Sequence, residues 1–388
     1  MYKTFNYFVL VFFFLVLALP LGGILSKASY DLNTLSQLIH NSYIHQVVYF
    51  SLYQAFISSF LSCLIAIPFA LALNRNKNHK IVKIIISICG FSFVIPSILI
   101  VYAVIKLFGN NGLFNTYFNL YELISINSIY GFKAILIAHI LLNAPFATRL
   151  IFQNLNNIPQ KYYEISSSLN LTYIGNIYKI ELPIIRQNLF SVFAIIFSLC
   201  FLSFAIVMAL GGGPSYSTIE VAIYQYALFE LNFDKAIILS FIQITICLLF
   251  VFIGFYKLKG SNFFEVDIAS NFHPHKNLLV VKIFDIAIIL IFSCLLFSPI
   301  FIIIINLIDN EYKNILYDIN FIKAFKNSLI ISLATGIFVT IIGFVLSSLL
   351  VLNNKNIYFQ QSLFLISSSI IIISPIILSL GYFIILGD

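Results

Sequence analysis

Residues 164–183 have the sequence EISSSLNLTYIGNIYKIELP and form a long polar interruption in a chain that is otherwise mostly apolar. Ile165 and Leu169 are four positions apart, which places them on one face of a helix. After a break, a second stripe of isoleucines at helical spacing begins at Ile174, and we expect Pro183 to end it. The stretch therefore predicts two short amphipathic helices joined by a turn, a protrusion that can dock into a groove on another protein.

The spacing of this stretch resembles the cytoplasmic coupling loop of ABC importer permeases. In that loop, Glu-Ala-Ala is followed by three residues, Gly, nine residues and Ile-x-Leu-Pro. Here Glu164 has the acidic position, and Ile180, Leu182 and Pro183 match the end of the pattern in register. The resemblance implies that Glu164 contacts a nucleotide-binding partner. The simpler interpretation is a carboxylate at the start of the first helix, where the helix dipole favours negative charge.

The chain departs from this pattern at two places. Ile165 and Ser166 stand where the family has two Ala residues, and Asn170 stands where it has Gly. Asn is the residue after Gly that most readily adopts a left-handed conformation, so we expect the bend at Asn170 to survive. Gly175 allows a close approach at the docking surface or is only part of a turn, and both interpretations stay open.

The composition indicates a membrane protein. Of the 388 residues, 61% are hydrophobic and 9% are charged, which is too apolar for a soluble globular protein. Apolar runs of about 20 residues recur, each long enough to cross about 30 Å of hydrocarbon. Because backbone groups in lipid must be satisfied within each segment, we predict an all-α polytopic bundle with about nine spans. The resemblance implies that the bundle is of the type I importer permease kind. The expected spans are residues 7–25, 47–73, 84–107, 131–152, 189–210, 235–256, 280–307, 327–352 and 359–386.

The distribution of basic residues predicts the orientation of these spans. With the N-terminus in the cytoplasm, most of the 21 Lys and Arg residues fall in cytoplasmic stretches, and the opposite stretches are richer in acid. This places a coupling loop, residues 153–188, in the cytoplasm. We therefore expect a multi-pass protein surrounded by the lipid bilayer, and the resemblance implies that this membrane is the bacterial inner membrane. The net charge of +7 follows this sidedness and does not indicate nucleic-acid binding.

The second half of the sequence restarts the first. Ser51-Leu52 matches Ser328-Leu329 at an offset of 277, and Pro96 matches Pro375 at an offset of 279. We therefore predict a first permease repeat of six spans over residues 1–260 and an incomplete second repeat of three spans over residues 261–388. A full second repeat needs three more spans and another coupling loop. We expect a fragment, a truncated inactive permease, or a chain completed by another polypeptide.

Three further blocks narrow the resemblance. They are residues 139–153 in the fourth expected span, the run Leu210-Gly-Gly-Gly-Pro214 after the fifth, and residues 217–225. Together they are similar to permeases of bacterial thiamine (or thiamine pyrophosphate) importers, with iron(III) importer permeases as the alternative. The resemblance implies two protein partners, an ABC ATPase subunit and a periplasmic substrate-binding protein.

Two groups of residues are candidates for the translocation pathway or its gate. A Pro within a span frees a backbone carbonyl, and a buried polar side chain there faces a cavity or makes a hydrogen bond between helices. A Gly-rich run lets the chain bend at the outer mouth, as a gate or as an ordinary periplasmic turn. The candidates are Asn143, Pro145, Gly211, Gly212, Gly213, Pro214 and Glu220.

The sequence predicts a transport subunit and not an enzyme. It has no Gly-x-x-x-x-Gly-Lys-Ser/Thr motif, so we expect ATP to be hydrolysed by the partner subunit. Its His and Cys residues lack metal-ligand spacing, and we expect no bound metal or other cofactor. We interpret His273 and His275 as part of a solvated linker and Asp285 as an interfacial charge. A secondary transporter would need ionisable residues at mid-membrane, and a membrane enzyme would need a clustered polar set; both are scarce here.

Overall fold

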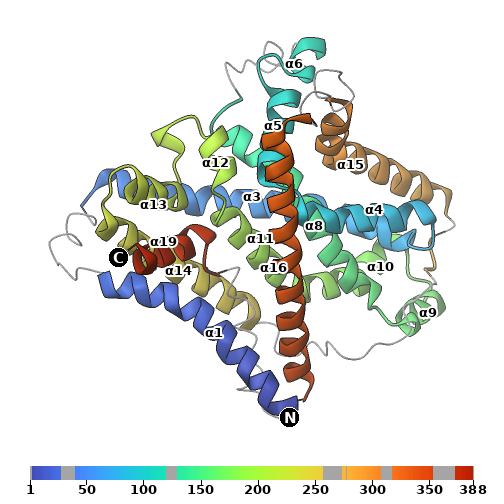
Figure 1. Cartoon of the computed structure of the whole chain (residues 1–388). Coiled ribbons are helices and arrows are strands. Elements are labelled where there is room, and N and C mark those ends of the chain that lie inside the picture. The colour runs from blue at the N-terminus through green and yellow to red at the C-terminus, as the bar shows by residue number, and fades with distance from the viewer. Residues whose placement is uncertain are drawn as a thin grey trace. The chain divides into compact units, whose positions relative to one another are not determined.

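A computed structural model of the chain describes residues 2–27, 40–118, 129–256, 273–276, 278–306, 317–352 and 372–387. These residues are helices and their connections, and none of them lies in a strand (Figure 1). Seven of the described helices are long and apolar enough to cross a membrane, and two shorter apolar helices span residues 10–26 and 375–386. The predicted all-α class is confirmed. The number of spans stays a prediction, since residues 359–371 of the last one lie outside the described residues.

The chain forms two compact units. The larger unit comprises Leu38–Ala222 and Thr245–Ile303, and the smaller comprises Met1–Gln37, Ile223–Ile244 and Ile304–Asp388. Helices of the larger unit are α3 (Ser42–Arg75), α4 (Lys80–Phe91), η1 (Ser92–Val94), α5 (Ser97–Phe108), α6 (Leu113–Phe118), α8 (Phe132–Asn156), α9 (Gln160–Ser168), α10 (Tyr173–Asn176), η2 (Ile177–Glu181), α11 (Leu182–Phe201), α12 (Ala205–Leu210) and η3 (Pro214–Tyr216). The smaller unit contains α1 (Tyr2–Lys27), α16 (Ile319–Leu352) and α19 (Pro375–Leu386), while α13 (Ile219–Leu228), α14 (Phe233–Tyr256) and α15 (Leu279–Asn306) contribute residues to both.

The core of the larger unit is built on α3, against which α8 and α11 pack. In lipid, helices associate mainly through close van der Waals packing and interhelical hydrogen bonds, so small residues gather where helices approach. On α3 such residues are buried along the whole contact, at Ser51, Ala55, Ser58, Ser59 and Ser62. Towards the end of α3 that carries Arg75, Phe69 and Leu73 join a larger apolar cluster that includes residues of α4, α8 and α15. This packing fixes the end of α3 that the functional site uses.

The third expected span is broken in the structure. We predicted one helix over residues 84–107, but α4 ends at Phe91 and α5 begins at Ser97, with the turn η1 between them. Ile95 has extended backbone angles, as expected for a residue that precedes proline. Pro96 has no N–H to continue the helical hydrogen bonds, so the apolar run contains two helices.

Two pairs of helices have equal lengths at positions that the predicted internal repeat pairs with each other. α3 and α16 each have 34 residues, and both their first and their last residues are 277 positions apart. α5 and α19 each have 12 residues at an offset of 278. The division into repeats at residue 260 stays a prediction.

Within the smaller unit, α1 packs along α19. The Tyr382 hydroxyl donates to the Val16 carbonyl at 2.8 Å, and a Cβ at Gly381 would collide with the Pro20 carbonyl. Gly381 therefore allows the two helices to approach closely.

Candidate functional site

The predicted coupling loop is a helix, a left-handed bend and a second helix. α9 ends at Ser168, and Asn170 has a φ of 47°, so the bend predicted at this position is confirmed. The N–H groups of Asn170 and Leu171 donate to the carbonyls of Ser167 and Ser166, both at 3.0 Å, which closes the end of α9. α10 then begins after Thr172, whose hydroxyl accepts from the Gly175 N–H at 3.1 Å as an N-cap. Gly175 here is part of this capped turn.

Pro183 does not end the second helix, and that prediction is wrong. α10 continues into η2, a π-helical turn, and then directly into α11, in which Pro183 lies in the first turn. A proline is tolerated there because the first turn of a helix does not need its N–H, and the π turn adjusts the chain just before it. The loop is consequently continuous with the span α11.

Glu164 does not start the first helix, so the interpretation as a helix-start charge is also wrong. α9 begins at Gln160, and no acidic residue lies in its first turn. Glu164 is one turn further on, is exposed, and accepts a hydrogen bond from the Gln160 side chain at 2.7 Å. Its carboxylate is thus presented on the surface of the loop.

The coupling loop has one apolar face that faces outward. Ile165, Leu169, Ile174 and Tyr178 are exposed by 56%, 66%, 64% and 67%, respectively. The opposite face is buried and includes Ser166, whose hydroxyl donates to the Tyr163 carbonyl at 2.8 Å. Exposed apolar residues gathered beside a surface carboxylate are typical of a protein interaction site.

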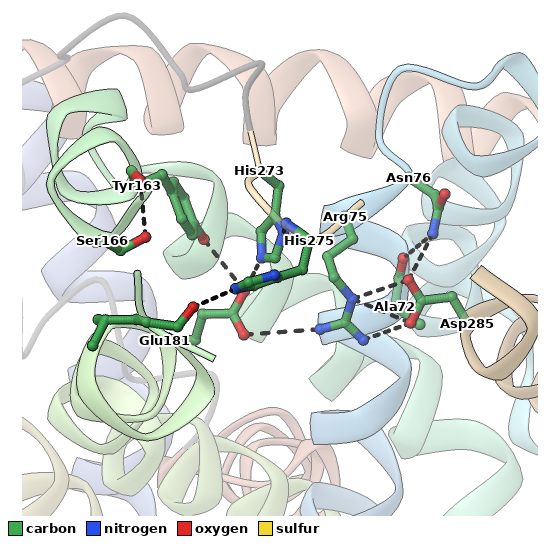
Figure 2. A network of polar contacts seen from close by, with 10 residues as sticks. Ala72, Arg75, Asn76, Tyr163, Ser166, Glu181, His273, His275 and Asp285 are labelled. Carbon is green, nitrogen blue, oxygen red and sulfur yellow. Dashed lines mark hydrogen bonds and ion pairs between the residues drawn. The ribbon is translucent and has the colours of Figure 1, made fainter. Parts of the chain in front are cut away.

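Beneath the loop lies a buried charge cluster formed by Arg75, Glu181, His273 and Asp285 (Figure 2). At the end of α3, the Arg75 guanidinium makes a bidentate pair with Asp285 of α15, with Nη2 to Oδ1 at 2.6 Å and Nε to Oδ2 at 2.9 Å. The Asn76 side-chain amide donates to the same carboxylate at 3.1 Å. Such forked pairs are among the stronger polar contacts. Asp285 is therefore a buried ion-pair partner, a contact that the sequence analysis did not predict, and its place at the membrane interface stays a prediction.

Glu181, at the end of η2, is the other carboxylate of the cluster and is fully buried. Its Oε2 lies 3.8 Å from Arg75 Nη1, and its Oε1 lies 3.2 Å from His273 Nε2. The Tyr163 hydroxyl of α9 donates to Oε1 at 3.3 Å. Burial, reinforced by the negative charge of Glu181, raises the pKa of Tyr163 above its ordinary value, so the phenol keeps the proton that it donates.

His273 and His275 lie against the coupling loop, and the prediction of a solvated linker is wrong. His275 Nε2 donates to the Leu171 carbonyl at 2.8 Å, just after the bend, while His273 reaches Glu181 at the far end of η2. The sequence analysis missed this cluster. The available signal was Asp285, an acidic residue inside an apolar run, which must find a partner to be tolerated there.

The candidate pathway residues fall in two places. Asn143 is buried on α8 and donates to Cys200 Sγ of α11 at 3.3 Å, and Pro145 is buried on the same helix, as is His139. His139 lies 3.2 Å from the Ser58 hydroxyl of α3. Both contacts join side chains of two different helices. They agree with one of the two roles expected for these polar residues, a hydrogen bond between helices.

The Gly-rich run lies apart from Asn143 along the chain. Gly212 and Gly213 have φ values of 71° and 134°, which favour glycine, and Pro214 begins η3. Glu220 is buried in the first turn of α13. A role of these residues in a pathway or gate stays a prediction.

A family model described as "Binding-protein-dependent transport system inner membrane component" matches residues 65–260. The chain is 31% identical to the thiamine transport system permease protein ThiP of Haemophilus influenzae, over 90% of this chain and 65% of the relative. It is 29% identical to the protein of the same name from Escherichia coli, again over 90% of this chain and 65% of the relative. The chain thus spans just under two thirds of the length of these relatives.

Among solved structures, the chain resembles one chain of a bacterial alginate ABC transporter in complex with an alginate pentasaccharide-bound periplasmic protein. The match covers 66% of this chain and 92% of that chain, with a TM-score of 0.52 and 16% sequence identity. At this identity the likeness shows the fold alone, and that fold is the one predicted from the sequence.

Proposed function

The chain belongs to the family of binding-protein-dependent transport system inner membrane components, and from this premise we propose that it is the permease subunit of an ATP-driven ABC importer for thiamine or thiamine pyrophosphate. The observation that carries the proposal is the part of the coupling loop from α9 to η2, residues 160–181, whose apolar face is exposed and whose opposite face is buried. The names of the relatives from Haemophilus influenzae and Escherichia coli support the substrate.

The coupling loop is the docking site for a separate ATPase subunit. Ile165, Leu169 and Tyr178 supply apolar surface for a groove on that subunit, and Glu164 supplies a charge at its edge. Because α10, η2 and α11 are continuous, a force applied to the loop is passed directly to a span. ATP binding and hydrolysis by the partner would then shift the permease between outward- and inward-open states.

The loop and the N-terminus face the cytoplasm, and a periplasmic binding protein delivers the substrate at the opposite face. The excess of Lys and Arg in the stretches expected on the cytoplasmic side supports this orientation. Thiamine is a cation, so aromatic side chains along a pathway could assist its passage.

Co-purification with the candidate ABC ATPase tests the docking proposal. We expect Glu164→Lys to reduce the captured ATPase at least about tenfold, a loss equivalent to about 1.4 kcal/mol of binding. Glu230→Lys is the matched control, because Glu230 is also exposed but follows α13 in a stretch expected on the periplasmic side. The proposal fails if the wild type captures no ATPase, or if the two variants lose it equally.

Uptake into membrane vesicles tests the substrate. Vesicles that contain this chain, the ATPase and the binding protein should accumulate radiolabelled thiamine in an ATP-dependent manner. Accumulation of iron(III) in place of thiamine would contradict the proposed substrate while leaving the importer class intact.

A further inference from the structure

Arg149 is a charged residue within a candidate span, and no group of the described residues neutralises it. It lies on α8, about two turns before the end of the candidate span Phe132–Asn156, and its side chain is partly buried. Arg75 has a forked pair with Asp285, whereas the Arg149 guanidinium makes neither a hydrogen bond nor an ion pair within the described part of the chain. An arginine keeps its charge at every physiological pH, so a counter-charge from outside these residues would stabilise it.

The neighbouring helix α4 has a glycine at the point where this guanidinium lies. α4 packs against α8, and a Cβ at Gly90 would overlap the Arg149 guanidinium. Gly90 lies inside α4 and has no positive φ, so neither a turn nor the backbone conformation calls for glycine there. A glycine inside a helix destabilises it relative to alanine. The role of Gly90 that the structure shows is therefore to make room for the guanidinium, which lies against the α4 backbone.

The side of α4 that leads to this position is basic. Ser87 and Lys83 precede Gly90 by three and seven residues, which places all three on one face of the helix, and both side chains are exposed. The opposite side of α4 is buried in an apolar cluster with residues of α3, α8 and α15. A guanidinium whose N–H groups have no protein acceptor, next to a further cation, is suited to the oxygens of a phosphate, with which arginine forms forked pairs.

We propose that Arg149, seated on Gly90, binds a phosphate group. Two molecules present such a group to this chain. One is a phospholipid, whose headgroup a long arginine side chain can reach from within a span. The other is thiamine pyrophosphate, one of the two substrates proposed above. Only this second source relies on the proposed function, and the site needs no ATPase to be observed.

Two pairs of probes test the phosphate site on the purified, delipidated chain. Native mass spectrometry compares dioleoylphosphatidylglycerol with dioleoylglycerol, which has the same acyl chains and lacks the phosphate. Equilibrium dialysis compares radiolabelled thiamine pyrophosphate with thiamine. We expect at least one phosphate probe to bind about tenfold or more tightly than its phosphate-free counterpart, which corresponds to about 1.4 kcal/mol.

Substitutions at the site separate the guanidinium from charge in general. Arg149→Gln should weaken binding of the phosphate probe at least about tenfold, and Arg149→Lys, which keeps the charge but not the fork, about threefold. Gly90→Ala keeps the arginine but fills its seat, and should weaken binding about fivefold or more. Lys83→Gln is the matched control, because it removes an equal charge from the exposed surface of α4, and it should change the affinity less than about twofold.

Thermal unfolding without a phosphate probe separates binding from a structural role of Arg149. Because its guanidinium has no partner among the described residues, Arg149→Gln should unfold at the temperature of the wild type or above it. The phosphate probe should raise the unfolding temperature of the wild type and leave that of Arg149→Gln unchanged. A variant that is less stable without the probe, and responds to the probe as the wild type does, would overturn the proposal.

The two arms also identify the source of the phosphate. Binding of phosphatidylglycerol alone would assign the site to a phospholipid, and binding of thiamine pyrophosphate alone would assign it to the substrate. If neither probe binds, or if Arg149→Gln binds as the wild type does, the phosphate site is excluded. Arg149 lies outside residues 160–181, so phosphate binding in a protein that captures no ATPase would count against the proposed function alone. Capture of the ATPase without phosphate binding would count against this site alone.

Discussion

Helices α3 and α16 occupy matching positions in the predicted repeat, yet their surroundings differ. Each has 34 residues, and their bounds differ by the same 277 positions. In α3, 56% of the most apolar stretch is buried, whereas in α16 the share is 11%. Ser58 of α3 is fully buried, and Thr335, at the matching position of α16, is exposed.

This difference shows that the apolar length of a helix is set by its own sequence, whereas the burial of its side chains depends on the helices that pack against it. Both copies have the apolar length that makes a spanning helix, and both carry small polar residues at matching positions. Burial of those residues in α3 comes from α8 and α11, which pack against it. Within the described residues, the apolar cluster on α16 is confined to Val345, Leu346 and Leu349 near its end, with Leu10 and Phe13 of α1 beside it.

The two copies also differ in charge. α3 ends at Arg75, which the buried charge cluster uses, while the matching position of α16 is Leu352. The contact of Arg75 with Glu181 in the loop therefore depends on a residue that α16 lacks at the matching position. If the account is correct, matched substitutions in α3 and α16 should have unequal effects.

Removal of Arg75 should have the largest effect. Arg75→Met leaves Asp285 and Glu181 buried without their cation, and breaking a buried pair in this way costs about 3–5 kcal/mol. We expect the temperature at which the protein loses its monodisperse state in detergent to fall by several degrees. Lys326→Met, on the exposed surface of α16, is the control and should change it little. Equal losses in the two variants would contradict the role of the cluster.

Enlarging a small residue on each copy should give a smaller but still unequal effect. Ser58→Leu crowds the contact between α3 and α8 and removes the partner of His139, for a loss of about 1–3 kcal/mol. Thr335→Leu makes the same change at the matching, exposed position and should leave thermal stability unchanged. The comparison between the two helices fails if Thr335→Leu is as damaging as Ser58→Leu.

Substitution of Tyr163 should cause the smallest loss of stability of the three, and this loss should change at alkaline pH. Because its pKa is raised in the folded protein, its stabilising contribution is present below the ordinary tyrosine pKa of about 10 and is lost as the pH rises beyond it. Tyr163→Phe should be less stable by about 1 kcal/mol at neutral pH, and the gap should narrow above about pH 10. The exposed Tyr178→Phe is the control, and thermal unfolding at several pH values checks both. A difference in stability between the wild type and Tyr163→Phe that stays constant with pH would contradict this link between the pKa of Tyr163 and stability.

Local features of the fold could be predicted from the sequence. Apolar length indicates the spans, and the choice of Asn170 indicates the left-handed bend, because both depend on residues close together in the chain. The break at Ile95 and Pro96 also has a local cause, the restriction that proline places on the residue before it. We predicted one unbroken helix there because the apolar run is long enough for a single span. Pro183 shows the limit of such rules: the same residue that ends one helix is tolerated in the first turn of the next.

The buried charge cluster could not be predicted, because its members are distant in sequence. Arg75 and Asp285 are 210 positions apart, and Glu181 and His273 are 92 apart. Only the packing of α3, the loop and α15 decides which carboxylate meets which cation. The sequence does indicate that an acidic residue in an apolar run needs a partner, but it does not identify that partner.

Photo-crosslinking from the coupling loop tests the central claim most directly. A benzophenone amino acid replaces Tyr178, which is 67% exposed on the loop, or Tyr117, which is exposed on α6 at residues Leu113–Phe118. In membranes that contain the candidate ATPase, the account predicts a crosslink to that subunit from position 178 and none from position 117. Equal crosslinking from both positions, or none from position 178, would contradict the assignment of residues 160–181 as the docking site.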